Sequence, residues 1–196
     1  MNNVPLVIAS SNQGKIREFQ NLLKAFPLIL LSQPLGFEIE ETGESFLENA
    51  RIKAIAVSKE TGDISLADDS GLCVEALGGA PGVYSSRYAN SDDERIQKLL
   101  SELKPFSNRK AKFECALCVA LGEKVLIEVT GCCDGLITSF PRGENGFGYD
   151  PIFEVSGIRK TFAEMNYDNK KQFGHRGNAF KLLKPELKKM INAIER

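Results

Sequence analysis

The sequence predicts a single α/β domain over residues 1–196, built from alternating strands and helices. Two observations predict this class. Apolar runs of strand length alternate along the chain with segments whose apolar residues recur at helical spacing. The 196 residues are enough for one sizeable core, and no linker, repeat or low-complexity segment separates two domains. The pattern is compatible with a doubly wound sheet and with other α/β arrangements.

The charge balance argues against a general attraction to polyanions. With 25 Lys and Arg against 26 Asp and Glu, the formal net charge is -1, so we expect no nucleic-acid partner and no binding to anionic membranes. The apolar stretches are shorter than a membrane span, and the start of the chain lacks the basic-then-apolar order of a signal peptide. We therefore expect a cytoplasmic protein.

The five cysteines do not form a disulfide scaffold, because their number is odd and the chain is long. Cys115 and Cys118 lie in an alternating run that predicts a strand, where residues three apart face opposite sides and cannot share one ion. Adjacent Cys132 and Cys133 also face opposite sides of a strand and cannot bind one ion together. We expect buried, reduced thiols.

The amino-terminal segment predicts a strand, a tight loop and a helix. Val4–Ala9 is an apolar run, and the loop 10–15 precedes apolar residues at helical spacing: Ile16, Phe19, Leu22, Leu23 and Phe26. The first N–H groups of a helix lack intrahelical partners and carry the positive end of its dipole, so this junction suits phosphate. Lys15 adds a charge, but Ile16 stands where a Walker loop has Ser or Thr. An ordinary helix cap explains the loop equally well.

A second strand, Leu28–Leu31, is followed by a predicted helix from Ser45 to Thr61 that ends at Gly62. One face of this helix is apolar: Phe46, Ala50, Ala54 and Val57. Lys53 lies on or beside that face, which predicts that its ammonium reaches an anion. Glu40 and Glu41 precede the helix, where its dipole favours carboxylates.

The apolar run from Ile64 ends in Asp68, Asp69, Ser70 and Gly71, so we expect a buried strand to end there. Its end would present two carboxylates and a hydroxyl to a hard cation. A simple turn is the alternative, because these residue types dominate turns. Neighbours on a continuing strand face opposite sides, so both aspartates can share one ion only if the strand has ended.

The next elements form a scaffold. Ser91–Glu94 is a capping-box pattern that begins a helix with Ile96, Leu99, Leu100 and Leu103 in register. Phe113–Leu121 and Val125–Thr138 predict two long strands around a turn at 122–124.

The loop Pro141–Pro151 is rich in glycine and contains Phe147, Tyr149 and Asp150. It is either a surface loop or a place where a flat ligand stacks on an aromatic ring beside an accessible backbone. A short strand follows at 152–155, and Pro185 is expected to open the final amphipathic helix.

Several of these stretches occur together and in order in one family. The chain resembles the Ham1 family of nucleoside triphosphate pyrophosphatases, which remove inosine and xanthosine triphosphates. The resemblance runs from the first strand to the last helix. It rests on Ser11-Asn12-Gln13-Gly14-Lys15, Glu41-Thr42-Gly43, Glu48-Asn49-Ala50, Ala67 to Leu72, Gly78 to Gly82, Gly146 to Pro151, Lys160-Thr161, Ala163-Glu164-Met165 and His175-Arg176.

The resemblance implies an α/β fold with an elongated, twisted mixed sheet and flanking helices that form two lobes around a central cleft. It also implies a homodimer and Mg²⁺-dependent hydrolysis of ITP, dITP and XTP between the α and β phosphates, which removes them before incorporation into DNA or RNA. By position, Glu40 and Asp69 would hold the metal, and Asp69 would accept the proton of the attacking water. The implied substrate-binding residues are Ser10, Ser11, Asn12, Gln13, Gly14, Lys15, Ser70, Phe147, Gly148, Tyr149, Asp150, Lys170, His175 and Arg176.

The chemistry suits these residue types. Mg²⁺ commonly takes one or two carboxylates and completes its shell with phosphate and water. Hypoxanthine and xanthine present a 6-oxo acceptor and an N1–H donor, whereas adenine reverses both. Arg176 or His175 could therefore donate to O6 while Asp150 accepts from N1–H. Two alternatives remain open: a nucleotide-binding module without turnover, and a related pyrophosphatase for other modified nucleotides.

Overall fold

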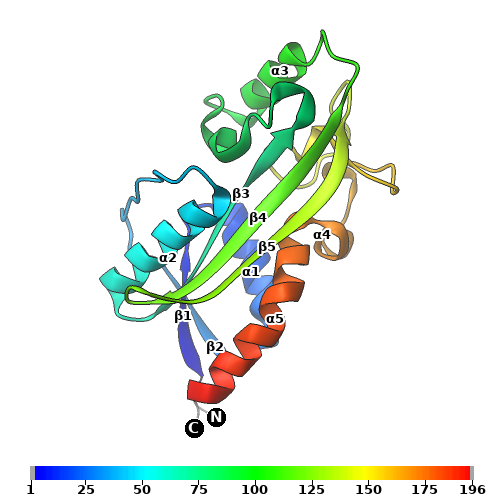
Figure 1. The fold of residues 1–196 in the computed structure, drawn as a ribbon. Helices are drawn as coiled ribbons and strands as arrows, with labels where there is room; N and C mark the ends of the chain where they lie inside the picture. Colours follow the sequence, from blue (N-terminus) through cyan, green and yellow to red (C-terminus); the bar gives the residue numbers. More distant parts are fainter. Residues whose placement is uncertain (1–2, 195–196) are drawn as a thin grey trace. The chain divides into compact units, whose positions relative to one another are not determined.

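The computed structural model describes residues 3–194. Figure 1 shows the elements in chain order. The strands are β1 (Val4–Ala9), β2 (Leu28–Ser32), β3 (Ile64–Val74), β4 (Lys110–Leu121), β5 (Lys124–Ile137) and β6 (Phe153–Val155). The α-helices are α1 (Gln13–Leu23), α2 (Phe46–Thr61), α3 (Asp92–Glu102), α4 (Tyr167–Phe173) and α5 (His175–Ile194), with 3₁₀ turns at Glu75–Leu77, Gly82–Arg87, Asp150–Ile152 and Phe162–Glu164.

The strands form one six-stranded mixed sheet in the order β2-β1-β3-β4-β5-β6. β1 runs parallel to both β2 and β3, and β6 runs antiparallel to β5. The predicted α/β class, with a mixed sheet and flanking helices, is confirmed, whereas the strand order is not something that periodicity alone determines.

Contacts divide the chain into two compact units. Unit 1 comprises residues 1–69, 116–130 and 179–196, and unit 2 comprises residues 70–115 and 131–178. Neither unit is a continuous stretch of sequence. A single domain over residues 1–196 therefore stays a proposal, and each unit is described separately below.

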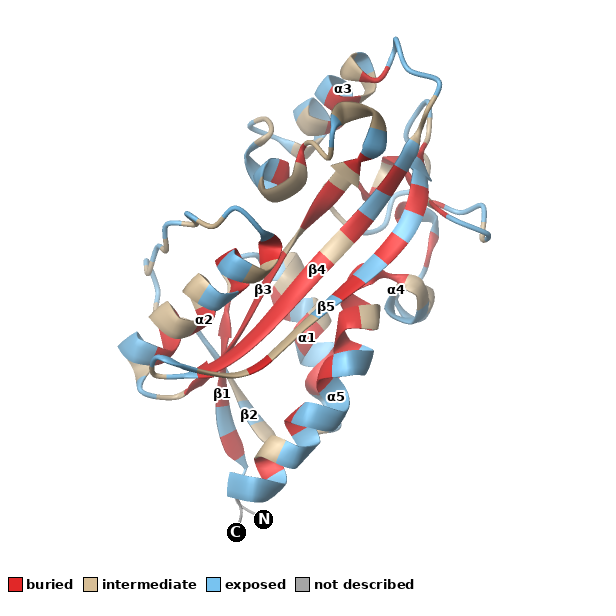
Figure 2. Cartoon of the chain, in the orientation of Figure 1, coloured by how far each residue is buried: buried red, intermediate tan, exposed pale blue. Residues whose placement is uncertain are grey.

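The core of unit 1 is formed by the apolar faces of its helices and by β1. Figure 2 shows buried positions recurring along the helices. Those of α1 are Ile16, Phe19, Leu22 and Leu23, and the apolar ones of α2 are Phe46, Ala50, Ala54 and Val57. On α2, Ser45 caps the start in a capping box with Glu48, and Gly62 ends the helix at a φ of 76°. The predicted bounds of this helix are confirmed because both caps are local sequence features.

The core of unit 2 is a cluster of aromatic and aliphatic side chains. The rings of Phe113, Phe153 and Phe162 lie with their centroids 4.7 to 5.7 Å apart. Leu72, Ile96 and Leu99 belong to the same cluster. The helix predicted after Ser91 is α3, and its apolar residues contribute to this core as expected.

The strand from Ile64 does not end at the aspartates, so this prediction is wrong. β3 continues through Asp68, Asp69, Ser70 and Gly71 to Val74. Turn propensity is local, whereas here a lysine outside the strand pairs with each aspartate and allows the extended backbone to continue. Because the backbone is extended from Ile64 to Val74, the alternative of a simple turn at these residues is excluded.

Pro185 does not open the last helix. It lies inside α5, which begins at His175. Proline removes the bond to the carbonyl four residues earlier, here that of Lys181, which is exposed and can be hydrated. Leu183 and Leu187 are fully buried on either side and keep the helix continuous by packing.

The thiols are only partly as expected. All five cysteines are free, and Cys115, Cys118 and Cys133 are buried, but Cys73 is half-buried and Cys132 is exposed. Cys132 is exposed because every second residue of this part of β5 faces solvent. No helix within residues 3–194 combines the length and apolarity needed to cross a bilayer.

Candidate active site

In unit 1, the loop before α1 is preorganised by its own side chains. The Asn12 side chain caps the helix by accepting a hydrogen bond from the Lys15 N–H at 3.1 Å, and the Ser10 hydroxyl accepts from the Asn12 N–H at 3.2 Å. Ser11, Asn12 and Gln13 are exposed. The first turn of α1 therefore presents the positive end of its dipole to solvent, as an anion site requires.

Lys15 is held at this helix start by an ion pair with Asp68. Its ammonium lies 2.8 Å from Oδ1 of Asp68, whose side chain is fully buried. A buried carboxylate needs a compensating charge. Asp68 therefore fixes the Lys15 ammonium beside the exposed loop.

Asp69 faces a different lysine. The Lys53 ammonium lies 2.9 Å from Asp69 Oδ1 and 2.7 Å from Glu41 Oε1, and the three side chains are 9 to 20% exposed. Because Asp68 and Asp69 are consecutive on a continuing strand, their side chains separate to two partners. The prediction that Lys53 reaches an anion is confirmed.

Burial and neighbouring charges shift the pKa values of Asp69 and Lys53 in opposite directions. Burial raises the pKa of Asp69, the ammonium groups of Lys53 and Lys15 lower it, and the net shift is upward. Burial lowers the pKa of Lys53, but Asp69, Asp68 and Glu41 outweigh it, so the pKa of Lys53 is raised. Lys53 therefore remains an ammonium ion between carboxylates.

The segment that carries Glu41 is tied to the start of α2. The Gly43 N–H donates to Oδ1 of buried Asn49 at 2.8 Å, and Oε2 of Glu48 accepts from the N–H groups of Glu44 and Ser45. A Cβ at Gly43 would lie 2.7 Å from the same Asn49 oxygen, so only glycine fits without a shift. This packing sets the position of Glu41.

In unit 2, the glycine-rich loop closes on a buried aspartate. Oδ2 of Asp150 accepts hydrogen bonds from the Phe147 N–H at 3.0 Å and from the Lys170 ammonium at 2.7 Å. The ammonium also lies 4.8 Å from the centroid of the Phe147 ring. Gly146 has a φ of +84°, and a Cβ there would overlap Oδ2 of Asp150. The loop geometry therefore depends on this glycine.

The residues at the start of α5 are also buried. The His175 ring stacks on Phe113 at 4.7 Å with an interplanar angle of 12°, and Arg176 donates to the Ser70 hydroxyl at 3.0 Å. Both side chains are about 5% exposed or less. His175 is therefore buried against the aromatic core of unit 2.

Comparison with known proteins identifies the family. A family model described as the Ham1 family matches residues 6–186. This chain belongs to the Ham1 family. A protein named dITP/XTP pyrophosphatase from Prochlorococcus marinus strain NATL1A is 72% identical over the full length of both chains. One of that name from Synechococcus sp. strain CC9311 is 59% identical, with 97% of this chain and 93% of the relative covered.

Solved structures agree. A HAM1 protein from Coxiella burnetii is 42% identical and superposes with a TM-score of 0.87, and the Staphylococcus aureus Ham1 protein is 41% identical with a TM-score of 0.85. Each comparison covers 95% of this chain and 99% of the other. The resemblance recognised from the motifs is thus confirmed as family membership.

The predicted site residues of this Ham1 chain fall into two sets. Unit 1 contains the residues expected to bind phosphate and metal: Ser10 to Lys15, Glu40 and Asp69. Unit 2 contains those expected to bind the base: Ser70, Phe147, Gly148, Tyr149, Asp150, Lys170, His175 and Arg176. Within unit 2, contacts join Ser70 to Arg176 and Asp150 to Lys170.

Glu40 and Glu41 differ in their surroundings. Glu40 is exposed, whereas Glu41 is half-buried and shares Lys53 with Asp69. The assignment of Glu40 as a metal ligand stays a prediction, and Glu41 becomes a second candidate. The position of Lys53 on a largely apolar helix face was the sequence feature that could have indicated a nearby carboxylate such as that of Glu41.

The residues around Asp69 fit a divalent cation. Oδ2 of Asp69 is buried and has no hydrogen-bond partner among residues 3–194, so one oxygen remains available beside the Lys53 contact. No group of three or more His, Cys, Asp or Glu side chains within the described chain could hold a metal by itself. An ion here would need phosphate or water ligands, which is the usual situation for Mg²⁺.

Proposed function

We propose that this chain hydrolyses deaminated purine nucleoside triphosphates, namely ITP, dITP and XTP, to the monophosphate and pyrophosphate. The proposal rests first on one arrangement in unit 1: β3 holds Lys15 through Asp68 and places Asp69 next to Lys53 and Glu41. Family membership and relatives named dITP/XTP pyrophosphatase support the same reaction. The consequence would be removal of these nucleotides before they are incorporated into DNA or RNA.

The loop 10–15 and the two lysines would bind the triphosphate. The exposed helix start and the Lys15 ammonium attract phosphate oxygens. The Lys53 ammonium can exchange a carboxylate for a phosphate oxygen at little electrostatic cost, because both partners are anionic. Both lysines then offset negative charge that accumulates on the departing pyrophosphate.

Asp69 would act as the proton acceptor. A water molecule attacks the α-phosphorus, its proton passes to a carboxylate oxygen of Asp69, and the bond from the α-phosphorus to the bridging oxygen of pyrophosphate breaks. An aspartate whose pKa is raised by burial is a better base than an exposed one. Mg²⁺, which we propose is held by Asp69 with Glu40 or Glu41, would polarise the phosphates and acidify the water.

Unit 2 would select the base. Phe147 offers a ring for stacking, and we propose that Arg176 or His175 donates to the 6-oxo group while Asp150 accepts from N1–H. Adenine reverses both groups, so ATP would leave these partners unpaired and be rejected by a factor of about 10⁴. We propose that Ser70, Gly148, Tyr149 and Lys170 also contact the substrate.

The decisive experiment is a panel of nucleoside triphosphates with Mg²⁺, scored separately for pyrophosphate and orthophosphate. ITP, dITP and XTP should yield pyrophosphate, ATP should yield far less, and Asp69→Asn should abolish turnover while leaving the circular dichroism spectrum unchanged. ITP that releases only orthophosphate would refute the proposal. Binding of ITP without turnover would indicate a nucleotide-binding module, and preference for another modified nucleotide would indicate a related pyrophosphatase.

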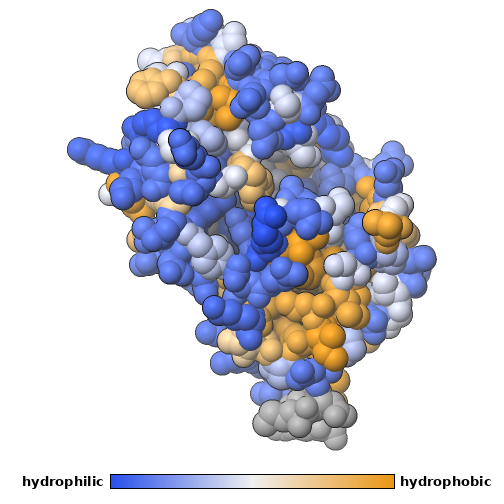
Figure 3. Space-filling model, turned by 180° about the vertical axis from the view of Figure 1, so that it is seen from behind, coloured by the Kyte–Doolittle hydropathy of each residue, from blue (hydrophilic) through white to orange (hydrophobic). Residues whose placement is uncertain are grey.

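We propose a homodimer that acts in the cytoplasm, where its substrates are formed. Exposed apolar residues support an interface: in unit 1, Ile29 and Leu31 on β2 are 48% and 39% exposed, and Figure 3 shows apolar side chains gathered in the lower part of that view. Light scattering of the purified protein tests the dimer, since a monomer mass at micromolar concentration contradicts it. Cell fractionation tests the location.

A further inference from the structure

We propose that Asp92, the first residue of α3, positions the backbone of the loop Phe147–Asp150 and thereby sets base selectivity. The inference rests on the proposed function, because it assumes that this loop contacts the base. Oδ2 of Asp92 accepts a hydrogen bond from the Gly148 N–H at 2.7 Å, which joins two segments 56 positions apart in the sequence. No sequence motif pointed to Asp92.

The loop is fixed at three points, and Asp92 holds the middle one. At Phe147, the backbone N–H is bound by Asp150, which is in turn paired with Lys170. At Tyr149, the buried phenol donates to the Ser85 carbonyl at 3.0 Å. Between these two, Gly148 has a φ of +60° and no side chain whose packing could fix its backbone. The orientation of its amide therefore depends on an external acceptor.

The Asp92 carboxylate is itself oriented. Its Oδ1 is ion-paired with Arg95, and the Arg95 Nε donates to the Ala89 carbonyl at 3.1 Å. The side chain of Arg95 is 20% exposed, so this guanidinium is largely held in place. The Asp92 side chain is 47% exposed, but each of its oxygens has a partner, Arg95 for Oδ1 and Gly148 for Oδ2, so the carboxylate is oriented and the hydrogen bond to Gly148 is charge-assisted.

The start of α3 is also stabilised by residues other than Asp92. Ser91 caps the helix by accepting from the Glu94 N–H, and Asp93 and Glu94 also supply negative charge to the first turn. Asp93 is exposed and occupies the same helical turn, so it experiences the same dipole without facing Gly148. It is the matched control for the contact.

Selectivity is sensitive to this contact because base recognition depends on the placement of hydrogen-bonding groups within fractions of an ångström. Gly148 follows Phe147 directly, so movement of its peptide displaces the ring on which the base would stack. The groups proposed to act on the triphosphate belong to unit 1, in loop 10–15 and at Asp68 and Asp69 of β3, whereas Asp92 and its partners Gly148 and Arg95 belong to unit 2. Loss of Asp92 should therefore weaken recognition of the base and spare recognition of the triphosphate.

The experiment compares Asp92→Ala, Asp92→Asn and Asp93→Ala in the full-length protein. For each variant, kcat/KM is measured for ITP and ATP, together with inhibition by inorganic tripolyphosphate, which has no base. We expect Asp92→Ala to lower the ITP-to-ATP preference about tenfold, the equivalent of one charge-assisted hydrogen bond, with inhibition by tripolyphosphate unchanged. Asp92→Asn keeps an oxygen acceptor for Gly148 and should lie closer to the unaltered protein.

Hydrogen exchange of the peptide that contains Gly148 provides a readout independent of turnover. Its amide should exchange faster in Asp92→Ala than in Asp93→Ala. Equal exchange and equal preference in the two alanine variants would overturn the role of Asp92. A general loss of stability would instead raise the inhibition constant for tripolyphosphate as well, and this too would count against positioning. If the unaltered protein releases no pyrophosphate from ITP, the proposed function itself has failed, and the exchange measurement still decides whether Asp92 holds the loop.

Discussion

Replacing Lys53 with methionine tests the charge arrangement at the centre of unit 1. The Lys53 ammonium lies 2.7 Å from Glu41 and 2.9 Å from Asp69, and its own side chain is 12% exposed. Methionine keeps most of the apolar stem, so the change removes the charge with little change in packing. Two carboxylates that share one cation would then face each other without it.

The size of the effect follows from burial. Breaking a buried ion pair costs about 3–5 kcal/mol because the remaining charge stays desolvated. Since Glu41 is 20% exposed and water screens it, we take the lower end, about 3 kcal/mol. A chain of this length loses about 2–4 °C in Tm per kcal/mol, so Lys53→Met should lower Tm by about 6–12 °C.

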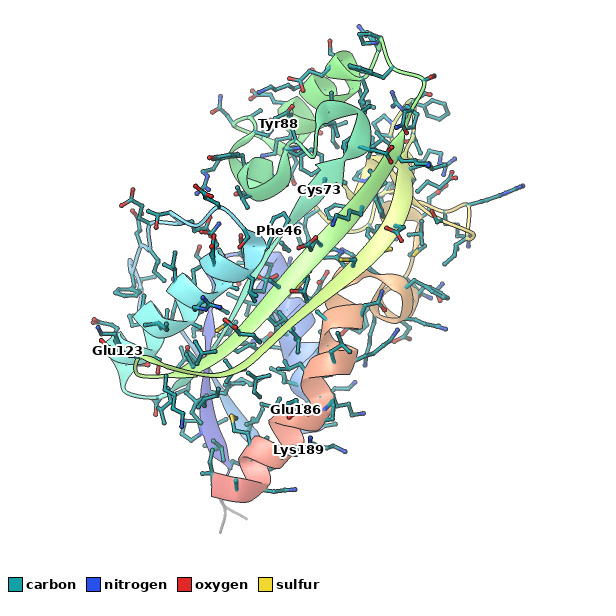
Figure 4. All side chains as sticks on the ribbon, viewed as in Figure 1. Phe46, Cys73, Tyr88, Glu123, Glu186 and Lys189 are labelled. Atoms are coloured by element: carbon teal, nitrogen blue, oxygen red, sulfur yellow. The ribbon has the colours of Figure 1, made fainter. Side chains whose placement is uncertain are left out.

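Lys59→Met is the matched control on the same helix. Lys59 pairs with Glu123, on the turn between β4 and β5 (Figure 4), but the two side chains are 56% and 80% exposed. Such exposed pairs are screened by water and contribute little to stability, so this variant should melt within a few degrees of the unaltered protein.

The assay is thermal unfolding followed by circular dichroism, with and without Mg²⁺. A divalent cation that binds Asp69 should raise the Tm of Lys53→Met more than that of the unaltered protein, because it replaces the missing ammonium. If Lys53→Met and Lys59→Met have the same Tm, breaking the buried ion pairs of Lys53 does not cost the free energy assumed above. If Mg²⁺ raises both melting points equally, the ammonium and the metal do not compete.

Three further predictions follow from other contacts. Backbone N–H groups of Glu44 and Ser45 lower the pKa of Glu48, so the ionised side chain should stabilise the fold fully above the ordinary glutamate pKa and lose this effect as pH falls through the lowered pKa. The difference in Tm between the unaltered protein and Glu48→Gln should therefore shrink on acidification. A difference that stays constant with pH would contradict this. Burial raises the pKa of the Cys118 and Cys133 thiols to about 12, so at pH 8 they stay protonated; a disulfide reagent should modify exposed Cys132 first, half-buried Cys73 (Figure 4) more slowly, and the other three only after denaturation. Gly146→Ala forces a side chain against Asp150 at a positive φ and should lower kcat/KM for ITP at least about tenfold, while Glu144→Ala on the same exposed loop should not; equal values would show that the loop tolerates the shift.

The elements that could be predicted are those with local determinants. The capping box at Ser45 and the glycine at 62 determine the ends of α2, and apolar alternation with a turn at 122–124 predicted the β4–β5 pair. Where a long-range contact competes with a local preference, the prediction was wrong. β3 continues because Lys15 and Lys53 each pair with one of its aspartates, and α5 continues through Pro185 because buried leucines lie on either side.

The candidate site was predictable in its residue types and less so in its contacts. The motifs that resemble the Ham1 family indicated Asp69, Phe147 and Arg176 without any knowledge of their surroundings. Asp92 was missed because its importance comes from Gly148, a partner distant in the sequence that no periodicity indicates. Glu41 was missed as a metal-ligand candidate because its importance comes from Lys53, which it shares with Asp69, and only the position of Lys53 on an apolar helix face pointed to that contact. Aspartates at helix starts are common for capping reasons alone, so Asp92 could not be distinguished from Asp93 in the sequence.

The continuation of β3 changes what its paired aspartates can do. Had the strand ended at Asp68, both carboxylates could have turned to one cation, and removing either would have affected the same ion. On an extended backbone the two side chains face opposite sides, so Asp68 serves Lys15 and Asp69 serves Lys53 with the proposed metal and water. The two residues should therefore fail differently: loss of Asp68 frees a lysine beside the phosphate loop and acts on substrate affinity, whereas loss of Asp69 removes the proton acceptor and acts on kcat.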